Sequence, residues 1–247
     1  MSGRCLLYYI TDRTALARDE TSRRHRLLEK IAEATRAGVD CIQLREKDLS
    51  TRELEALARE AVSAIHEARR LTPEPWPMAP ALLVNSRTDV ALATGADGIH
   101  LRSDDISPQQ VKAIWTTSQV GTAVNGGLAA EVAAASAAPT RGLPGQRPLI
   151  GVSCHSPEEV ATAAANGATF AVFAPVFEKR EAPGTQSAGL AQLHEACRAP
   201  IPVLALGGIT VQNANSCLEA GAAGIAAIRL FQENDITAIV RTLHQAR

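Results

Sequence analysis

Short apolar runs alternate with amphipathic stretches along the whole of this 247-residue chain. The apolar runs cover 6–12, 41–47, 81–86, 98–102, 148–155, 170–177, 201–208 and 224–231. Apolar runs of about 4–8 residues with helical stretches between them are typical of parallel strands buried on both faces. A chain of about 250 residues is also the usual length of one (β/α)8 barrel. We therefore predict an α/β fold, a single-domain TIM barrel over residues 1–247.

The stretches between the apolar runs have the pattern of helices. They cover roughly 22–37, 50–70, 87–94, 107–115, 157–166, 189–198, 211–220 and 235–246. A turn that begins with glycine leads from helix to strand at 38–42, 95–99, 167–171 and 221–225. Its glycine suits the left-handed cap that ends many helices. About two βα units separate successive turns, so this internal repeat supports the eight-strand count.

The repeat is stretched in the middle of the chain, where extra residues fall in 116–147. This segment is rich in Ala, Gly, Thr and Pro. We interpret it as a loop insertion between the fourth strand and helix and the fifth strand, with one short helix at most. Because βα alternation resumes directly after it, the segment is not expected to divide the chain into domains.

Charge and cysteine content narrow the classes of function. The formal net charge is −1, which favours neither nucleic acid nor an anionic membrane as a partner. The five cysteines are odd in number and include no C-x-x-C pair, so reduced thiols are expected rather than disulfides or zinc. No apolar run approaches the ~18 residues of a membrane span, and a signal-peptide pattern is missing. We expect a cytoplasmic protein with small-molecule partners, and a homo-oligomer stays open.

Three polar residues alternate at the end of the second apolar run: Gln43, Arg45 and Lys47. Active sites of such barrels lie at the C-terminal ends of the strands, and alternate residues of a strand share a face. Two cations and an amide facing the barrel interior need an anionic partner. A phosphate or diphosphate would be one, since arginine binds it bidentately. The alternative is a salt-bridge layer with Glu46, Asp48 or another interior acid.

A second candidate site follows the last two apolar runs. Gly207 and Gly208 end the seventh run, and Ile228 and Arg229 lie near the end of the eighth. Glycines allow backbone N–H groups to approach a phosphate, and the loops after strands 7 and 8 commonly bind one. We predict a substrate phosphate at this end of the barrel. A plain turn is the alternative.

Two aspartates, Asp104 and Asp105, follow the fourth apolar run. Their hard oxygen donors could bind Mg²⁺. Alternatively, one of them or Ser107 caps the next helix ahead of Pro108.

Histidines occur at two strand ends. His155 follows Ser153 and Cys154, and it could be a general acid or base near neutral pH or hydrogen-bond a neighbouring loop. Cys154 is interpreted as a small buried residue. His100 is expected to line the barrel together with Arg102, because strand alternation places both on one face.

In this order, the motifs resemble those of the thiamine phosphate synthase / thiazole tautomerase family. The matching pieces are YYITD (8–12), CIQLREK (41–47), LLVNSRTDVALATGADGIHLRSDD (82–105), LIGVSCHSPEEV (149–160), APVF (174–177), VLALGGIT (203–210) and AGAAGIAAI (220–228). Together they span nearly the whole chain outside the insertion. The resemblance implies an enzyme of thiamine biosynthesis that acts on phosphorylated pyrimidine and thiazole compounds.

The synthase branch of this family joins a pyrimidine methyl diphosphate to a thiazole phosphate and releases diphosphate with the help of Mg²⁺. The resemblance implies that the pyrimidine and its diphosphate are held by Gln43, Arg45, Lys47 and Asn85. It also implies Asp105 as a magnesium ligand and Ser153 as a neighbour of the diphosphate. The backbone of Gly208 would lie near the thiazole phosphate.

Three positions depart from the synthase pattern. Ser86 follows Asn85, where synthases usually carry a second metal-binding aspartate. Arg102-Ser103 occupies the place of a usual Gly-Gln. After the sixth apolar run, Lys179 and the next arginine stand where synthases carry a Thr-x-Thr-Lys clamp for diphosphate, so Lys179 is expected to supply the charge from a shifted position.

The tautomerase branch is the alternative function. It converts a thiazole carboxylate phosphate into its aromatic form by proton transfer, without a metal. His155 matches its catalytic histidine, and Ser107-Pro108 matches its pattern after strand 4, although many synthases also carry that histidine. A non-catalytic member that binds thiazole phosphate or thiamine phosphate is a third hypothesis. Because the QLREK motif is complete and Asp105 is present, we predict a synthase-type transferase, with Arg45, Lys47, Ser153 and His155 as catalytic candidates.

Overall fold

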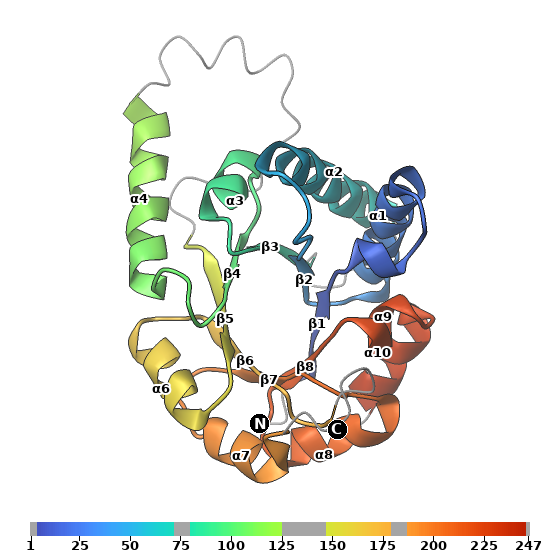
Figure 1. The fold of residues 1–247 in the computed structure, drawn as a ribbon, viewed down its shortest axis with the longest axis vertical. Coiled ribbons are helices and arrows are strands. Elements are labelled where there is room, and N and C mark those ends of the chain that lie inside the picture. Colours follow the sequence, from blue (N-terminus) through green and yellow to red (C-terminus); the bar gives the residue numbers. More distant parts are fainter. Residues whose placement is uncertain (1–3, 72–79, 125–146, 179–186, 246–247) are drawn as a thin grey trace.

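The computed structural model describes residues 4–71, 80–124, 147–178 and 187–245. Eight parallel strands close into a barrel in which neighbours in sequence are neighbours in space, and β8 pairs with β1 (Figure 1). The strands are β1 (Leu6–Ile10), β2 (Cys41–Leu44), β3 (Ala81–Asn85), β4 (Gly98–Leu101), β5 (Leu149–Cys154), β6 (Phe170–Phe173), β7 (Val203–Ala205) and β8 (Gly224–Ala227). The predicted TIM barrel is confirmed.

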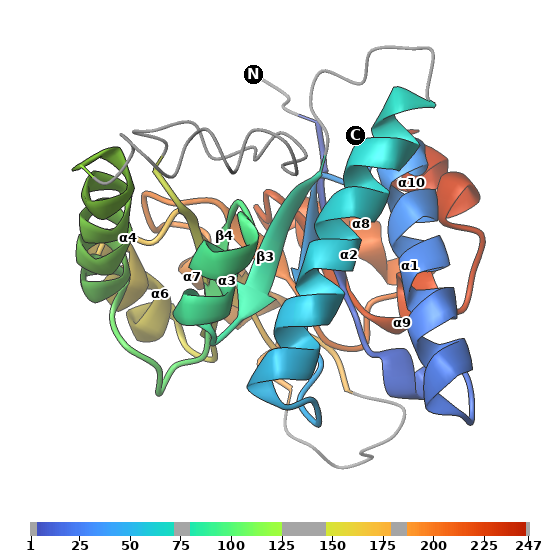
Figure 2. The same cartoon turned by 90° about the horizontal axis from the view of Figure 1, so that it is seen from above.

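Helices cover the outside of the barrel, and α1 and α2 pack side by side along it (Figure 2). They are η1 (Arg13–Ala15), α1 (Glu20–Ala37), α2 (Thr51–Arg70), α3 (Thr88–Thr94), α4 (Pro108–Val124), α6 (Pro157–Ala165), α7 (Gly189–Ala196), α8 (Val211–Glu219), α9 (Arg229–Gln232) and α10 (Ile236–Gln245). Among the residues with described positions, none of these helices has the length and apolarity to cross a membrane.

Apolar side chains form two layers. One large cluster packs between the strands and the helices, and a smaller one fills the barrel interior. The interior cluster contains Tyr8 and Phe170, whose rings meet edge to face with centroids 5.4 Å apart, a favourable aromatic geometry. Because side chains fill the interior, a ligand can bind only at an end of the barrel.

The glycines of the internal repeat take the predicted left-handed conformation. Their φ angles are 89° at Gly38, 69° at Gly95, 81° at Gly167 and 104° at Gly221. Each stands where a helix ends and the chain turns into the next strand. The repeat is therefore a consequence of the same backbone turn in alternate βα units.

Helix α4 is longer than predicted, because it continues to Val124 rather than ending at residue 115. The first part of the predicted loop 116–147 is therefore helical. The hydroxyl groups of Thr116 and Thr117 each donate to a backbone carbonyl one turn earlier at 2.9 Å, so these residues are accommodated within the helix. Residues 125–146, the rest of the predicted insertion, lie outside the described residues.

The eighth strand is shorter than predicted and ends at Ala227, with α9 in place of residues 229–231 of the strand. The backbone N–H groups of Phe231 and Gln232 donate to the carbonyl of Ile228. A continuous apolar run is compatible with either a buried strand or a buried helix. Composition alone could not locate this change of conformation.

Candidate functional site

A cavity of about 640 Å³ opens at the C-terminal ends of the strands. Its walls contain most of the predicted site residues, namely Gln43, Arg45, Lys47, Asn85, Ser153, His155, Gly207, Gly208, Ile228 and Arg229. His100, Arg102 and Asp104 lie on the same walls. Asp105 is not among the described residues that line the cavity, and Lys179 is outside the described residues. The fold thus gathers polar groups from six strand ends around one space.

The second strand ends at Leu44, so Arg45 and Lys47 belong to the turn after β2 and not to the strand itself. The alternation nevertheless continues, because both side chains line the cavity while Glu46 between them is buried. Gln43 is only 1% exposed, and its Nε2 has no hydrogen-bond partner within the described part of the chain. An unsatisfied buried donor costs about 1–3 kcal/mol. A ligand acceptor in the cavity would recover this cost.

Arg45 is half-buried at the cavity wall, and its guanidinium forms no ion pair with the residues that the structure describes. Burial lowers the pKa of Arg45, and the carboxylates of Asp12 and Glu46 partly offset this effect. The predicted alternative of a salt-bridge layer does not account for Arg45, because Glu46 and Asp48 pair with Arg13 instead. Its charge therefore suits an anionic ligand.

A hydrogen-bonded chain runs from the barrel interior to the cavity. The Tyr8 hydroxyl lies 3.1 Å from His100 Nδ1, and His100 Nε2 lies 2.8 Å from Ser153 Oγ. Burial, with the charge of Arg45, lowers the pKa of His100 to about 3, so the ring is neutral. Because His100 is the acceptor available to the buried Tyr8 hydroxyl in the described structure, we assign the ring proton to Nε2. Ser153 then accepts from His100 and keeps its own proton for a ligand.

His155 is exposed at the end of β5, and its ring contacts the neighbouring loop after β6. Nδ1 lies 2.6 Å from the backbone oxygen of Ala174, and this oxygen can only accept, so Nδ1 carries the proton when the ring is neutral. The Nε2 lone pair is then available as a base. Both predicted alternatives, a loop contact and an acid–base group, are compatible with this arrangement.

The loop after β4 holds the predicted metal residue in a hydrogen-bonded position. Asp105 Oδ2 accepts from the Ser86 hydroxyl at 2.6 Å and from the backbone N–H of Arg102 at 2.8 Å. The Arg102 side chain forms an ion pair with Asp104 at 3.0 Å. Ser107 and Gln110 exchange hydrogen bonds at the start of α4, so Ser107 and neither aspartate caps that helix.

Metal ligands are few at this end of the barrel. Over the described ranges, no cluster of three or more His, Cys, Asp or Glu side chains has the geometry to hold a metal ion. Asp105 offers one carboxylate, and Ser86 a neutral oxygen in place of a second one. Mg²⁺ is commonly held by one or two carboxylates together with substrate phosphate oxygens. By this pattern, the one carboxylate of Asp105 would suffice only where substrate phosphate oxygens supply further ligands.

The opposite end of the cavity is built from backbone. Gly207 and Gly208 have φ angles of 99° and 62°, values that side chains other than glycine rarely adopt. The Asn213 side chain donates to the carbonyl of Gly208 at 2.9 Å and thereby ties the loop to α8. Both glycines line the cavity just before α8 begins, and backbone N–H groups ahead of a helix suit an anion.

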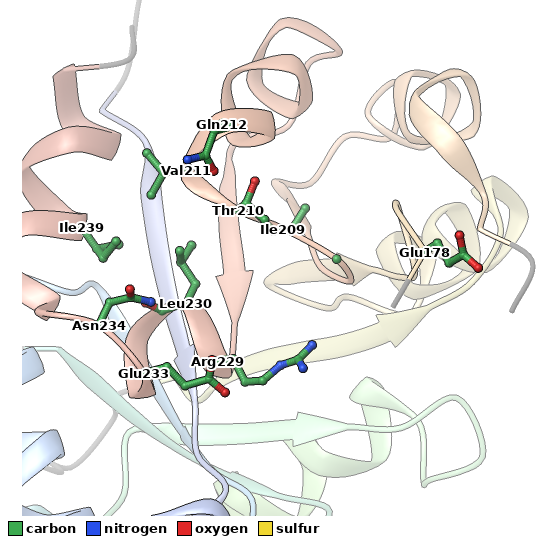
Figure 3. Close-up of a pocket in the computed structure, with 11 residues that line it drawn as sticks. Glu178, Ile209, Thr210, Val211, Gln212, Arg229, Leu230, Glu233, Asn234 and Ile239 are labelled. Carbon is green, nitrogen blue, oxygen red and sulfur yellow. The ribbon is translucent and has the colours of Figure 1, made fainter. Parts of the chain in front are cut away.

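A second hollow of about 600 Å³ adjoins this backbone end and shares Gly208, Ile209, Arg229 and Leu230 with the main cavity. Figure 3 shows Thr210 and Ile209 on one side of it and the side chain of Arg229 on another. Arg229 comes from the first turn of α9, the element that was predicted as strand. The short helix thus places a cation beside the predicted phosphate position.

Sequence patterns did not identify two groups that support the cavity. Tyr8 belongs to a run that reads only as strand core, and Arg13 follows the first strand without a recognisable motif. One signal could have indicated Arg13. Glu46 lies between two residues that face the cavity, so it must face away from it and needs a cation there.

Comparisons with known proteins give a consistent result. The family described as thiamine monophosphate synthase matches residues 7–142 and 134–231. A putative thiamine-phosphate synthase of Geobacter sulfurreducens is 40% identical over 225 residues, 90% of this chain and 84% of the relative. Putative thiamine-phosphate synthase 2 of Aquifex aeolicus is 33% identical over 92% of this chain and 97% of its own. The solved structure of thiamine phosphate pyrophosphorylase from Pyrococcus furiosus has a TM-score of 0.69 at 26% identity, covering 98% and 94% of the two chains.

Proposed function

Since this chain belongs to the thiamine monophosphate synthase family, we propose that it joins a pyrimidine methyl diphosphate to a thiazole phosphate. The products are thiamine phosphate and diphosphate. The observation that carries the proposal is the half-buried guanidinium of Arg45, which forms no ion pair with the described residues, together with the buried Nε2 of Gln43, which has no partner among them. Both face the same cavity as the open backbone at Gly207 and Gly208. One end suits a diphosphate and a polar ring, and the other suits a phosphate.

The proposed reaction follows from the different groups at the two ends of the cavity. The bond between the pyrimidine methylene carbon and the diphosphate oxygen breaks, and its electron pair leaves with the diphosphate. Arg45 and Lys47 stabilise the charge that develops on the departing oxygens, as preorganised donors do in other enzymes. The thiazole nitrogen then donates its lone pair to the benzylic-type carbon and forms the new C–N bond.

The remaining predicted residues bind or orient the substrates. Gln43 Nε2 donates to the pyrimidine, and Asn85 lies beside it at the end of β3. The Ser153 hydroxyl, held by neutral His100, donates to the diphosphate. Gly208, Ile228 and Arg229 hold the thiazole phosphate, and Lys179 is proposed to contribute its charge to diphosphate binding.

Asp105 would hold a magnesium ion at the diphosphate end of the proposed site. When bound, Mg²⁺ would neutralise part of the diphosphate charge and make it a better leaving group. Ser86 orients the Asp105 carboxylate through its 2.6 Å hydrogen bond. The partners proposed are these small phosphorylated substrates, and the proposed location is the cytoplasm.

A paired assay tests the proposal. Purified protein is incubated with both substrates, with and without Mg²⁺, and the release of diphosphate and the formation of thiamine phosphate are measured. We expect both products in equal amounts, and we expect the Arg45→Ala variant to form them about 10²–10³ times more slowly. Absence of both products with the unaltered protein and Mg²⁺ would overturn the proposal.

Thiazole tautomerase is the second candidate, because the hydrogen bond to Ala174 leaves Nε2 of His155 available as a base. In this reaction, His155 would remove a proton from the thiazole carboxylate ring and return it elsewhere. Aromatisation of that substrate without metal, lost in His155→Ala, would establish this function. Tight binding of thiazole phosphate with neither activity would instead indicate a binding protein.

A further inference from the structure

A buried arginine lies directly behind the proposed diphosphate end. The side chain of Arg13, in η1, is 3% exposed. Its guanidinium bonds Asp48 at 2.6 and 3.0 Å, Glu20 at 2.9 and 3.1 Å, and Glu46 at 3.3 Å. Burial acts to lower the pKa of Arg13, but the bonds to Asp48 and Glu20 outweigh it and raise the pKa. All N–H donors of the Arg13 guanidinium are therefore used within this cluster.

The cluster is connected to the backbone that carries the cavity cations. The backbone N–H of Arg13 donates to Glu46 Oε2 at 3.0 Å, and the Thr11 hydroxyl donates to Glu46 Oε1 at 2.5 Å. Thr11 Oγ1 in turn accepts from the backbone N–H of Arg45 at 3.1 Å. Both oxygens of Glu46 are thus fixed from the β1 side.

Glu46 sits between Arg45 and Lys47 in the sequence. Arg45 and Lys47 line the cavity while Glu46 between them is buried, so fixing Glu46 toward Arg13 keeps both neighbours on the cavity side. The turn after β2 has left the sheet at Leu44, so ladder hydrogen bonds no longer hold it there. The Arg13 cluster supplies the anchoring that the sheet does not.

We propose that Arg13 is a positioning residue that sets the direction of Arg45 and Lys47 and thereby their affinity for diphosphate. This rests on the proposed function only in that diphosphate is the anion those two residues bind. Arg13 itself touches no ligand, since Glu46, Asp48 and Glu20 occupy its donors. A role in stability alone would affect every ligand of the cavity equally, whereas a positioning role affects the diphosphate end.

The test uses inorganic diphosphate as the probe, together with the Michaelis constants of both substrates. We expect Arg13→Gln to weaken the binding of inorganic diphosphate and to raise KM for the pyrimidine diphosphate by about tenfold, the scale of an outer partner that orients a ligand-binding group. KM for the thiazole phosphate should change less than about twofold, the error expected of independent sites. An equal rise in KM for both substrates would overturn the proposal.

Arg24→Gln is the matched control, because Arg24 also pairs bidentately with a carboxylate, Glu60, on the same side of the barrel but away from the cavity. It should leave all three constants unchanged. Where Arg13→Gln fails to fold, Asp48→Asn removes a half-exposed part of the cluster and should show the same split at smaller size. Unchanged diphosphate binding in a folded Arg13 or Asp48 variant overturns the positioning role.

The same titration separates this inference from the proposed function. If the unaltered protein binds inorganic diphosphate and Arg45→Ala does not, the diphosphate end stands, and the Arg13 variants decide the positioning role alone. If the unaltered protein does not bind inorganic diphosphate at all, both the diphosphate end and the positioning role are wrong.

Discussion

The two ends of the cavity are proposed to bind anions by different physical means. At the β7–β8 end, Gly207 and Gly208 line the cavity, and the donors proposed there are their backbone N–H groups. At the β1–β2 end, the proposed anion-binding groups are the long side chains of Arg45 and Lys47. The buried ion cluster around Arg13 holds the turn that carries them. Backbone donors need the right φ angles, whereas side-chain donors need a support. Substitutions should therefore damage the two ends in distinguishable ways.

The largest effect is expected at the side-chain end. Arg45→Ala removes a preorganised donor at the position where charge develops, and loss of one such donor typically costs about 10²–10³ in kcat. Steady-state release of diphosphate measures it. Arg59→Ala, which removes an exposed ion pair with Glu55 on α2, is the control and should leave kcat within about twofold. A loss confined to the KM of the thiazole phosphate would place the diphosphate elsewhere.

A pair of glycine substitutions tests the proposed phosphate site at the backbone end of the cavity. Gly208→Ala places a Cβ 2.5 Å from the carbonyl oxygen of Glu178 at φ +62°, so we expect a loss of about 1–3 kcal/mol in stability and a raised KM for thiazole phosphate. Gly189→Ala has a similar φ of +75°, but its Cβ would meet no described atom within 4 Å. It should cost about 1–2 kcal/mol, the penalty of a left-handed conformation for an L-residue, and leave KM unchanged. Equal KM values in the two variants would contradict a phosphate site at Gly208.

At the side-chain end, the proposed requirement for Mg²⁺ rests on the carboxylate of Asp105. Asp105→Asn should raise the Mg²⁺ concentration at half-maximal activity by about tenfold or more, since even the loss of an outer partner of a ligand costs this much. Asp104→Asn, which alters an exposed neighbour paired with Arg102, should have the smaller effect. Activity measured over a magnesium titration gives both values. The opposite order would assign the metal to Asp104.

Between the two ends, neutral His100 makes a smaller contribution that depends on pH. Its pKa is lowered to about 3 in the fold, mainly by burial, and is near 6.5 when unfolded. The unfolded state therefore binds more protons than the folded state as the pH falls below 6.5. The folded state loses stability as a result, by about 1 kcal/mol at pH 6.

Unfolding free energies at pH 8 and pH 6, for the unaltered protein and for His100→Gln, measure this contribution. The variant should lack that part of the pH dependence, because the other titrating groups are common to both proteins. An identical pH dependence in the two would mean that His100 has the same pKa in the folded and unfolded states.

The comparison of the two ends also explains what the sequence could and could not predict. The barrel was predictable because buried parallel strands are apolar throughout and because its glycine caps repeat. Gly207-Gly208 and QLREK were recognisable since each lies in one short segment at a strand end. The Arg13 cluster and the Tyr8–His100–Ser153 chain were not, because their members come from different strands and meet only when the barrel closes. Helix α9 was read as strand because apolar runs do not distinguish the two.

The most direct test of a cavity with two different anion sites is a crystal structure with thiazole phosphate and inorganic diphosphate bound together. We predict diphosphate oxygens within hydrogen-bond distance of the Arg45 guanidinium and the Lys47 ammonium group. We predict the thiazole phosphate on the backbone N–H of Gly208, with Arg229 beside it. Diphosphate bound at Gly207 and Gly208, with Arg45 left without a ligand, would contradict the account.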